Sequence, residues 1–336
     1  MDPRMMSRTT RRKVPMHEDP WKGLTPATGQ IVGRRVSIEH PLDAFWIKGA
    51  DGSPGLLLRG IDPLRVPNQL PKPRGLMLHT VLDAPRAEAS MFLREHEDRE
   101  VFLTLCKDVI SHSGGSATPA DATSSLFRRL AHWHSLMTRG RAAAMSPHEV
   151  RGLVGELFVM ERLAASVGFS SALDAWVAPD EHPQDFACKS RLLEVKTRLS
   201  GSRQVIRISS LAQLEPAQLP LILVVVELMA SEENDAATLN QICARLIDRA
   251  RLISSQMVDQ IESALFKRGY VHLEAYDSEA YRVTGITAFE CRDGFPRLVR
   301  SEVDVRIPEA KYVVDLVLVS EFAISTESVL DTGVDG

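Results

Sequence analysis

The segment Leu221–Met229, LILVVVELM, restricts the fold of this chain more than any other part of its sequence. Eight of its nine residues are apolar, and four of these are β-branched. A run that is apolar on both alternating faces is typical of a β-strand covered by other layers on both sides. No apolar run in the chain approaches the roughly 18 residues of a membrane-spanning helix. The sequence therefore predicts a soluble α/β fold with a buried central strand and no membrane segment.

A complete helix-start signal precedes this strand. Ser146 has the position of the N-cap, Pro147 the first helical position, and Glu149 the position that closes a capping box. An apolar stripe follows at helical spacing, and Glu156 lies at its edge. The sequence predicts an amphipathic helix that carries Glu156 beside the sheet.

Two short strand patterns lie between this helix and the apolar run, close enough to form a hairpin. Pairing residue 188 with residue 191 places Asp185 opposite Glu194, with their Cβ atoms about 5 Å apart. Glu194 and Lys196 share one face of their strand because side chains alternate. Two carboxylates this close repel each other unless a cation offsets the repulsion, and their oxygens suit Mg²⁺ or Mn²⁺. Lys196 is placed to orient an attacking water and to neutralise charge on a phosphoryl oxygen.

The neighbouring segments complete the predicted core. Residues 204–209 alternate as a third strand, and Leu211–Glu215 follows as a short helix that is capped by a serine and carries Gln213. The order helix, strand, strand, strand, helix, strand predicts a mixed sheet with helices on both faces. Glu227 interrupts the apolar run. It marks either the end of the buried run or a charge that is partnered at the sheet edge.

Composition divides the chain into six segments. They are a disordered basic tail (1–20), a β-rich region (21–111), a flexible linker rich in Ser, Gly, Ala and Thr (112–124), the α/β core (125–232), an α+β region (233–325) and a frayed tail (326–336). Within the α+β region the sequence predicts two helices. A hairpin then turns at Asp293-Gly294 and includes a strand over 303–307, and Tyr312–Phe322 forms a final strand.

Charge and cysteine content limit the function classes. The chain has 40 Lys and Arg against 44 Asp and Glu, a net charge of −4, but phosphates respond to local patches rather than to the total. Such a patch surrounds Lys196. Its other basic members are Lys189, Arg191, Arg198, Arg203 and Arg207. The four cysteines stand far apart without a C-x-x-C pair, which favours reduced thiols in a cytoplasmic protein over disulfides or zinc.

The order of these polar residues resembles that of the PD-(D/E)XK nuclease superfamily. In sequence order they are Glu156, Asp185, Glu194-Val195-Lys196 and Gln213. The stretches GLVGELFVMERL, PQDF, LLEVKT and IRISSLAQL further resemble a bacterial group of that superfamily encoded near phage-defence ATPases and helicase-like proteins. The resemblance covers about residues 146–230. One position departs from the pattern, because Gln184 rather than proline precedes Asp185.

The resemblance implies a restriction-endonuclease-like core and a Mg²⁺- or Mn²⁺-dependent DNA endonuclease that serves anti-phage defence. Asp185, Glu194 and the Val195 backbone carbonyl would be metal ligands, Lys196 the catalytic lysine, and Glu156 and Gln213 accessory catalytic residues. The implied partners are DNA, defence ATPases or helicase-like proteins, and a second copy of the chain.

An E-x-K tripeptide alone is common on exposed strands. Two alternatives to a DNA endonuclease therefore stay open. One is a catalytically inactive DNA-binding or assembly subunit with the same fold. The other is a nuclease that acts on RNA.

Overall fold

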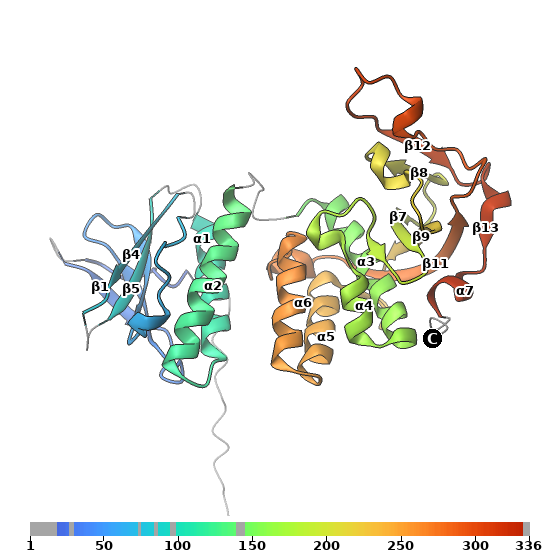
Figure 1. Ribbon diagram of the computed structural model, residues 1–336. Helices are drawn as coiled ribbons and strands as arrows, with labels where there is room; N and C mark the ends of the chain where they lie inside the picture. Colours follow the sequence, from blue (N-terminus) through green and yellow to red (C-terminus); the bar gives the residue numbers. More distant parts are fainter. Residues whose placement is uncertain are drawn as a thin grey trace, which may run out of the picture. The chain divides into compact units, whose positions relative to one another are not determined.

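The chain divides into two compact units, Met1–Thr138 and Arg139–Gly336 (Figure 1). The computed structural model describes residues 19–26, 30–72, 75–83, 87–94, 99–138 and 145–331. The predicted basic tail, residues 1–20, lies almost entirely outside the described residues.

The first unit is an antiparallel sheet covered by two helices. Its strands, in pairing order, are β1 (Val32–Arg35), β2 (Asp43–Lys48), β3 (Pro54–Arg59), β5 (Glu88–Leu93) and β4 (Leu76–Val81), and its helices are α1 (Arg99–Gly114) and α2 (Pro119–Thr138). Trp21 is fully buried in this unit, where it stacks on Phe102 of α1 and donates a 2.8 Å hydrogen bond to the Gly55 carbonyl. Burial of these large side chains stabilises the packing of α1 on the sheet.

The predicted flexible linker, residues 112–124, is wrong. This segment forms the end of α1, a short turn and the first turns of α2, and the chain divides into its two units only after Thr138. The hydroxyls that suggested a linker bond to the helix itself: Thr123 Oγ1 donates to the Pro119 carbonyl at 2.7 Å and Ser124 Oγ to the Ala120 carbonyl at 3.1 Å. Polar composition is compatible with a helix when the side chains bond back in this way.

The second unit is built on one mixed sheet. Its strands, in pairing order, are β10 (Ala237–Thr238), β11 (Ala280–Glu290), β9 (Leu221–Ala230), β7 (Leu192–Leu199) and β6 (Phe186–Ala187), and β13 (Ala323–Ile324) also pairs with β11. β7 and β9 are parallel and the other pairs are antiparallel. β9 is the apolar run, and it is buried on both faces as predicted.

The α-helices of this unit pack on one face of the sheet. They are α3 (Pro147–Val167), α4 (Phe169–Ala175), α5 (Leu239–Arg251), α6 (Ser255–Lys267) and the short α7 (Thr326–Leu330). The opposite face is covered by β8 (Val205–Ile208), which pairs with β12 (Tyr312–Asp315), and by the 3₁₀ helices η4 (Leu211–Leu214) and η7 (Ser320–Phe322). The prediction of helices on both faces is therefore confirmed only in part, because the second face carries short 3₁₀ helices and no described α-helix. The third predicted strand forms, but it lies outside the main sheet.

The crossover from β7 to β9 explains this difference. Parallel neighbouring strands need a crossover connection, which is usually an α-helix. Here the connection contains the strand-favouring sequence QVIRIS, and Pro216 and Pro220 restrict any helix to the short η4. The fold class is therefore mixed α/β, and the crossover from β7 to β9 consists of a strand and a short 3₁₀ helix instead of an α-helix.

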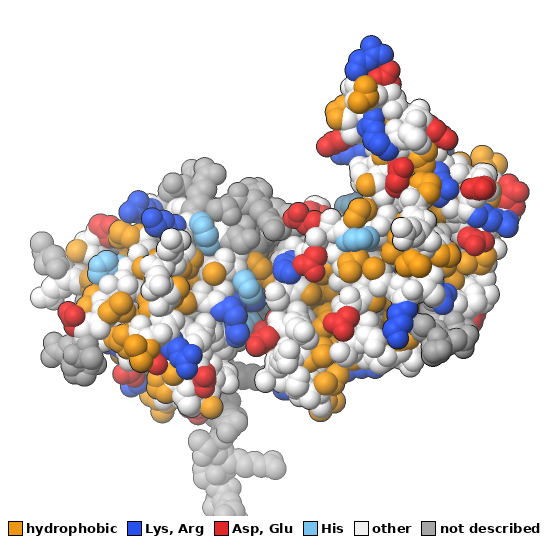
Figure 2. Space-filling model, viewed as in Figure 1, with side chains coloured by type: hydrophobic (Ala, Val, Ile, Leu, Met, Phe, Trp, Pro, Cys, Tyr) orange, Lys and Arg blue, Asp and Glu red, His pale blue; other side chains and the backbone are white. Residues whose placement is uncertain are grey.

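The C-terminal predictions are only partly correct. The two predicted helices are α5 and α6, but residues 303–307 form no strand. They lie in a projecting loop (Figures 1 and 2), in which the Arg300 guanidinium donates to the carbonyls of Val303, Asp304 and Ile307. Their alternating apolar residues are not packed on a sheet, since the Val305 side chain is 86% exposed.

The last segment of the chain is also more ordered than predicted. The strand predicted over Tyr312–Phe322 is limited to β12. The tail predicted to fray from residue 326 contains α7, whose Val329 and Leu330 are buried against the α3 side of the sheet, and residues 332–336 lie outside the described part. No helix among the described residues is long and apolar enough to cross a membrane.

Candidate active site

A hairpin places two carboxylates on neighbouring strands. β6 and β7 pair with Phe186 opposite Leu193 and Ala187 opposite Leu192, and the same register, if continued, would put Asp185 opposite Glu194. The Asp185 amide donates to the carbonyl of Leu193, the partner of Phe186, at 3.0 Å, so the pairing becomes irregular at Asp185. The predicted register is confirmed for residues 186–188 against 191–193, and Asp185 lies next to the end of this ladder.

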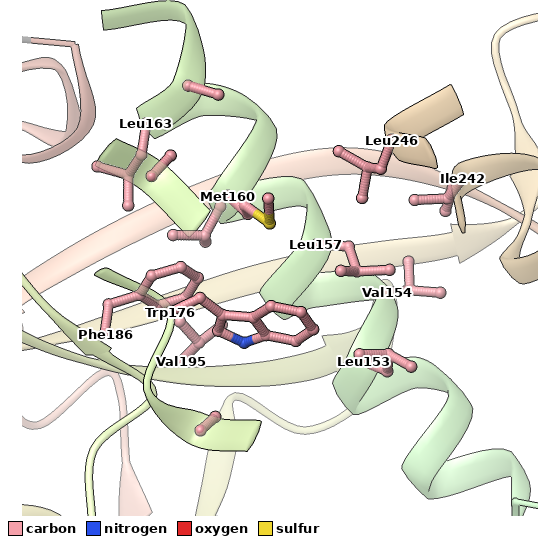
Figure 3. Packing of buried hydrophobic residues seen from close by; sticks show 14 of the residues in the cluster. Leu153, Val154, Leu157, Met160, Leu163, Trp176, Phe186, Val195, Ile242 and Leu246 are labelled. Carbon is pink, nitrogen blue, oxygen red and sulfur yellow. The ribbon is translucent and has the colours of Figure 1, made fainter. Parts of the chain in front are cut away.

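The faces of β7 follow its alternating sequence. Leu193 and Val195 belong to the core beneath α3, where Val195 lies beside Trp176 and Phe186 (Figure 3). Glu194 alternates with these residues and therefore points to the opposite face, as does Lys196. The ion pair between Lys196 and Glu194 agrees with the prediction that the two share one face.

Asp185 is held in place by the backbone around it. Its Oδ2 accepts a 2.8 Å hydrogen bond from the Val195 amide, and its carbonyl accepts hydrogen bonds from Val177 at 3.0 Å and Ala178 at 3.1 Å. Burial raises the pKa of Asp185 well above its usual value, and the negative charges of Glu194 and Glu156 add to this effect. A carboxylate under such repulsion is stabilised by a cation.

Glu194 is fully buried, and neither of its carboxylate oxygens accepts a hydrogen bond of good geometry from a described residue. Lys196 Nζ lies 2.5 Å from Oε1 as an ion pair. Burial raises the pKa of Glu194 to about 7, against the opposing effect of Lys196. Buried polar atoms are almost always satisfied, so Oε2, which has no partner among the described residues, indicates a site that takes a cation or a donor.

Glu156 reaches the site from α3, but both of its carboxylate oxygens already accept hydrogen bonds. Its Oε2 accepts hydrogen bonds from Arg268 Nε and from Trp176 Nε1, each at 3.0 Å, and its Oε1 accepts from Arg268 Nη2. The prediction that Glu156 reaches toward a metal does not fit this arrangement, because both of its oxygens already have donors.

Gln213 lies on η4 and serves the local backbone. Its Oε1 accepts a 2.7 Å hydrogen bond from the Ser209 amide rather than one from Lys196. The residue that ties η4 to the site is the buried Gln184, whose Nε2 donates to the Ala212 carbonyl at 2.9 Å. The residue that departs from the family pattern thus anchors this turn beside Asp185.

The predicted basic patch separates into two groups. Lys189, Arg203 and Arg207 are exposed. Arg198 instead forms an ion pair with Glu227, and its side chain is only 10% exposed. Arg191 Nη1 donates to the Ser328 carbonyl at 2.7 Å. The role of Glu227, which the sequence left open, is therefore that of a charge partnered by the neighbouring strand.

Two residues of the site, Trp176 and Arg268, are not predicted by the sequence patterns. Arg268 lies 112 residues after its partner Glu156, so no local pattern connects them. The only available signal was Gly269, which marks the end of a helix and fixes where Arg268 stands but not what it contacts.

The donor set fits a hard divalent cation held by few protein ligands. Asp185 and Glu194 supply carboxylate oxygens. The Val195 carbonyl lies on the Asp185 side of β7, because the N–H and C=O of a strand residue point the same way and the Val195 N–H bonds Asp185. No group of three or more His, Cys, Asp or Glu side chains is arranged to hold a metal in the part of the chain that the structure describes. Mg²⁺ is commonly held by one or two carboxylates, with other oxygens completing its shell.

Comparison with known protein families gives a match over most of the chain. Residues 17–317 match the model of a family described as "Putative PD-(D/E)XK family member, (DUF4420)". No curated protein and no solved structure matches the chain.

Proposed function

Because the chain belongs to this PD-(D/E)XK family, we propose that it is a metal-dependent nuclease that hydrolyses phosphodiester bonds in DNA. The observation that carries the proposal is Glu194, a fully buried carboxylate close enough to Asp185 to raise its pKa. Its Oε1 forms an ion pair with Lys196, and its Oε2 has no hydrogen-bond partner among the described residues. A structural ion pair on an exposed strand would need neither the burial nor the second carboxylate.

We assign each residue of the site a separate role in hydrolysis. Asp185, Glu194 and the Val195 carbonyl would hold Mg²⁺ or Mn²⁺, which supplies a Lewis acid beside the phosphodiester. Lys196, 15% exposed, is the ammonium that can orient a water and offset charge that develops on phosphoryl oxygens. Its pairing with Glu194 keeps the ammonium at the acid pair.

Lys189, Arg203 and Arg207 are the members of the basic patch that remain exposed for contact with a phosphate backbone. Such contacts position nucleic acid without reading its sequence. The anti-phage role, the ATPase or helicase-like partners, the homo-oligomer and the cytoplasmic location stay predictions of the resemblance and of composition.

The test is cleavage of supercoiled plasmid by the purified full chain with Mg²⁺ or Mn²⁺. We expect Asp185→Asn and Lys196→Ala to lower the rate by about 100-fold or more. Asp185→Asn preserves the size of the side chain and an acceptor for the Val195 amide. Asp248→Asn, on the exposed face of α5, is the control and should cleave like the wild type.

Two outcomes would change the assignment. Nucleic-acid binding that needs no metal, without cleavage by the wild type, would support the inactive DNA-binding or assembly subunit. Faster cleavage of RNA than of DNA of the same sequence would make the substrate RNA.

A further inference from the structure

Arg268 stands at the C-terminal end of α6, outside the segment that carries the family motifs. Gly269 follows it with φ of +93°. The Gly269 amide donates to the Phe266 carbonyl at 2.8 Å and the Tyr270 amide to the Leu265 carbonyl at 3.0 Å. These two bonds define a Schellman motif, whose left-handed residue is usually glycine. The backbone of Arg268 is therefore fixed by the end of its own helix.

The side chain of Arg268 is fixed as well. Nε and Nη2 bind the two oxygens of Glu156, and Trp176 Nε1 shares one of them. The Glu156 side chain is 6% exposed, whereas 30% of the Arg268 side chain still reaches solvent. Nη1 makes no hydrogen bond to a described residue. The guanidinium is thus held rigidly on one edge and keeps donors on the other.

One short segment connects Arg268 to the acid pair. Trp176, which binds Glu156, forms a backbone bridge with Phe186, the residue after Asp185. The 3₁₀ helix η3 (Ala178–Asp180) follows, and its Ala178 amide donates to the Asp185 carbonyl at 3.1 Å. The end of α6 docks on the same η3, where Lys267 Nζ lies 2.5 Å from Asp180 Oδ1. The same segment therefore positions both Asp185 and the end of α6.

The electrostatics agree with this placement. Burial alone would lower the pKa of Arg268, but Glu156 raises it, and the charges of Asp185 and Glu194 add to the rise. The guanidinium therefore lies within electrostatic range of both members of the acid pair.

A phosphodiester approaching this site meets three acids, and Lys196 is already engaged by Glu194. A guanidinium with a free edge suits phosphate oxygens, because its planar donors match their geometry and it stays charged at any working pH. We infer that Arg268 binds an oxygen of the substrate phosphate, and that Glu156 and Trp176 are positioning residues that hold it there. This inference rests on the proposed nuclease function and makes α6 part of the site.

The alternative is that Arg268 has only a structural role and joins α6 to α3 through its ion pair with Glu156. Another arginine ion pair between helices of the same layer serves as a matched control. Arg245 on α5 pairs with Glu161 on α3 at 3.2 Å, on the same helical layer. The variants are Arg268→Ala, Arg268→Lys, Arg245→Ala, Glu156→Gln and the double variant Glu156→Gln/Arg268→Ala. The measurements on the full chain are kcat and KM for plasmid cleavage, and Mn²⁺ affinity by calorimetry without nucleic acid.

We expect Arg268→Ala to lower kcat/KM by about 100-fold, the size of effect seen when one preorganised donor is removed. Arg268→Lys should recover part of the loss, and Arg245→Ala should stay within about twofold of the wild type. The double variant should bind Mn²⁺ about fivefold more tightly than Glu156→Gln, because residue 156 is neutral in both and only the nearby cation is removed.

Two results together would overturn the inference: equal Mn²⁺ affinity of Glu156→Gln and the double variant, and a normal kcat/KM in Arg268→Ala. Arg268 would then have only the structural role of joining α3 to α6. Cleavage by the wild type in that experiment would still support the nuclease. If the wild type neither binds Mn²⁺ nor cleaves DNA or RNA, the proposed function fails and the inference fails with it.

Discussion

Gly155 on α3 faces Thr197 on β7 so closely that a Cβ at position 155 would lie 2.2 Å from Thr197 Cγ2. Real side chains do not approach at that distance, so only glycine allows α3 to lie this near the strand that carries Glu194 and Lys196. This approach sets the distance between the helix of Glu156 and the acid pair.

Gly155→Ala should therefore destabilise the second unit. Overpacking of a filled core costs about 1–3 kcal/mol, and the atoms in the way belong to a β-branched side chain on a central strand. Urea denaturation measures the change. Gly152→Ala is the control on the same helix, since a Cβ there meets nothing within 4 Å. It should stabilise the protein by about 0.4–1 kcal/mol, as expected for a helical glycine replaced without strain. Equal effects of the two variants would contradict the close packing.

Glu194→Gln should change stability in a pH-dependent way without metal. The folded pKa, about 7, lies above the ordinary value of 4.5, so the folded state binds the proton more strongly. The stability that Glu194 contributes is thus fully present below about pH 4.5 and is lost as pH rises through about 7. At pH 8 the Gln variant should be more stable by about 3 kcal/mol, whereas at pH 4 the two should be similar. Denaturant titrations at both pH values test this.

Mn²⁺ should make the wild type more stable than Glu194→Gln at pH 8, the reverse of the order expected without metal. Ligand binding to the folded state stabilises it by mass action, so the wild type should melt at a higher temperature with Mn²⁺ at pH 8. Glu194→Gln lacks one carboxylate ligand and should show a much smaller shift. Removing the metal with EDTA should restore the original difference. Identical shifts in both proteins would mean that Glu194 holds no metal.

Asp108→Asn should loosen the helix pair of the first unit. The Asp108 carboxylate accepts hydrogen bonds from Arg129 at 2.6 and 2.8 Å and from Trp133 Nε1 at 2.7 Å. Breaking one partner of such a buried pair costs about 3 kcal/mol. Hydrogen exchange should accelerate in α1 and α2 and stay unchanged in α3. The exposed pair of Asp304 with Arg306 is the control, and Asp304→Asn should leave exchange in α1 and α2 as it is.

The pH dependence of the same group follows from its pKa. Burial would raise the pKa of Asp108, but hydrogen bonds from His112 and Arg129 outweigh it and hold the pKa well below its usual value. The stability from this pair is therefore present above about pH 4 and lost as pH falls below it. Slow exchange in α1 and α2 should disappear with acid in the wild type, and Asp108→Asn should show little further change.

Alanine variants of Arg198 and Arg207 should affect different properties, stability for Arg198 and nucleic-acid binding for Arg207, although the sequence places both residues in one basic patch. Arg207→Ala removes an exposed charge, so it should weaken nucleic-acid binding, reduce its salt dependence and leave folding intact. Arg198→Ala leaves Glu227 without its partner and should lower the melting temperature first. Fluorescence anisotropy across a salt series, with thermal melts of each variant, separates the two. A lower melting temperature for Arg207→Ala would contradict this distinction.

The sequence by itself determined the features that depend on neighbours along the chain. Strand periodicity predicted the hairpin register that brings Asp185 close to Glu194, and it predicted the shared face of Glu194 and Lys196. The capping box at Ser146 fixed the start of α3, where Ser146 Oγ accepts from the Glu149 amide as predicted. Each of these follows from local backbone geometry, which a few consecutive residues specify.

Only the tertiary structure decided the partners of charged groups and the place of β8. Arg198 pairs with Glu227 and Arg268 with Glu156, across 29 and 112 residues respectively. β8 pairs with β12, a strand about 100 residues later, rather than with the main sheet, and the two-stranded sheet they form covers the hydrophobic face of β9. A side chain reveals its charge in the sequence, but packing between distant segments determines which opposite charge it meets and whether water still reaches it.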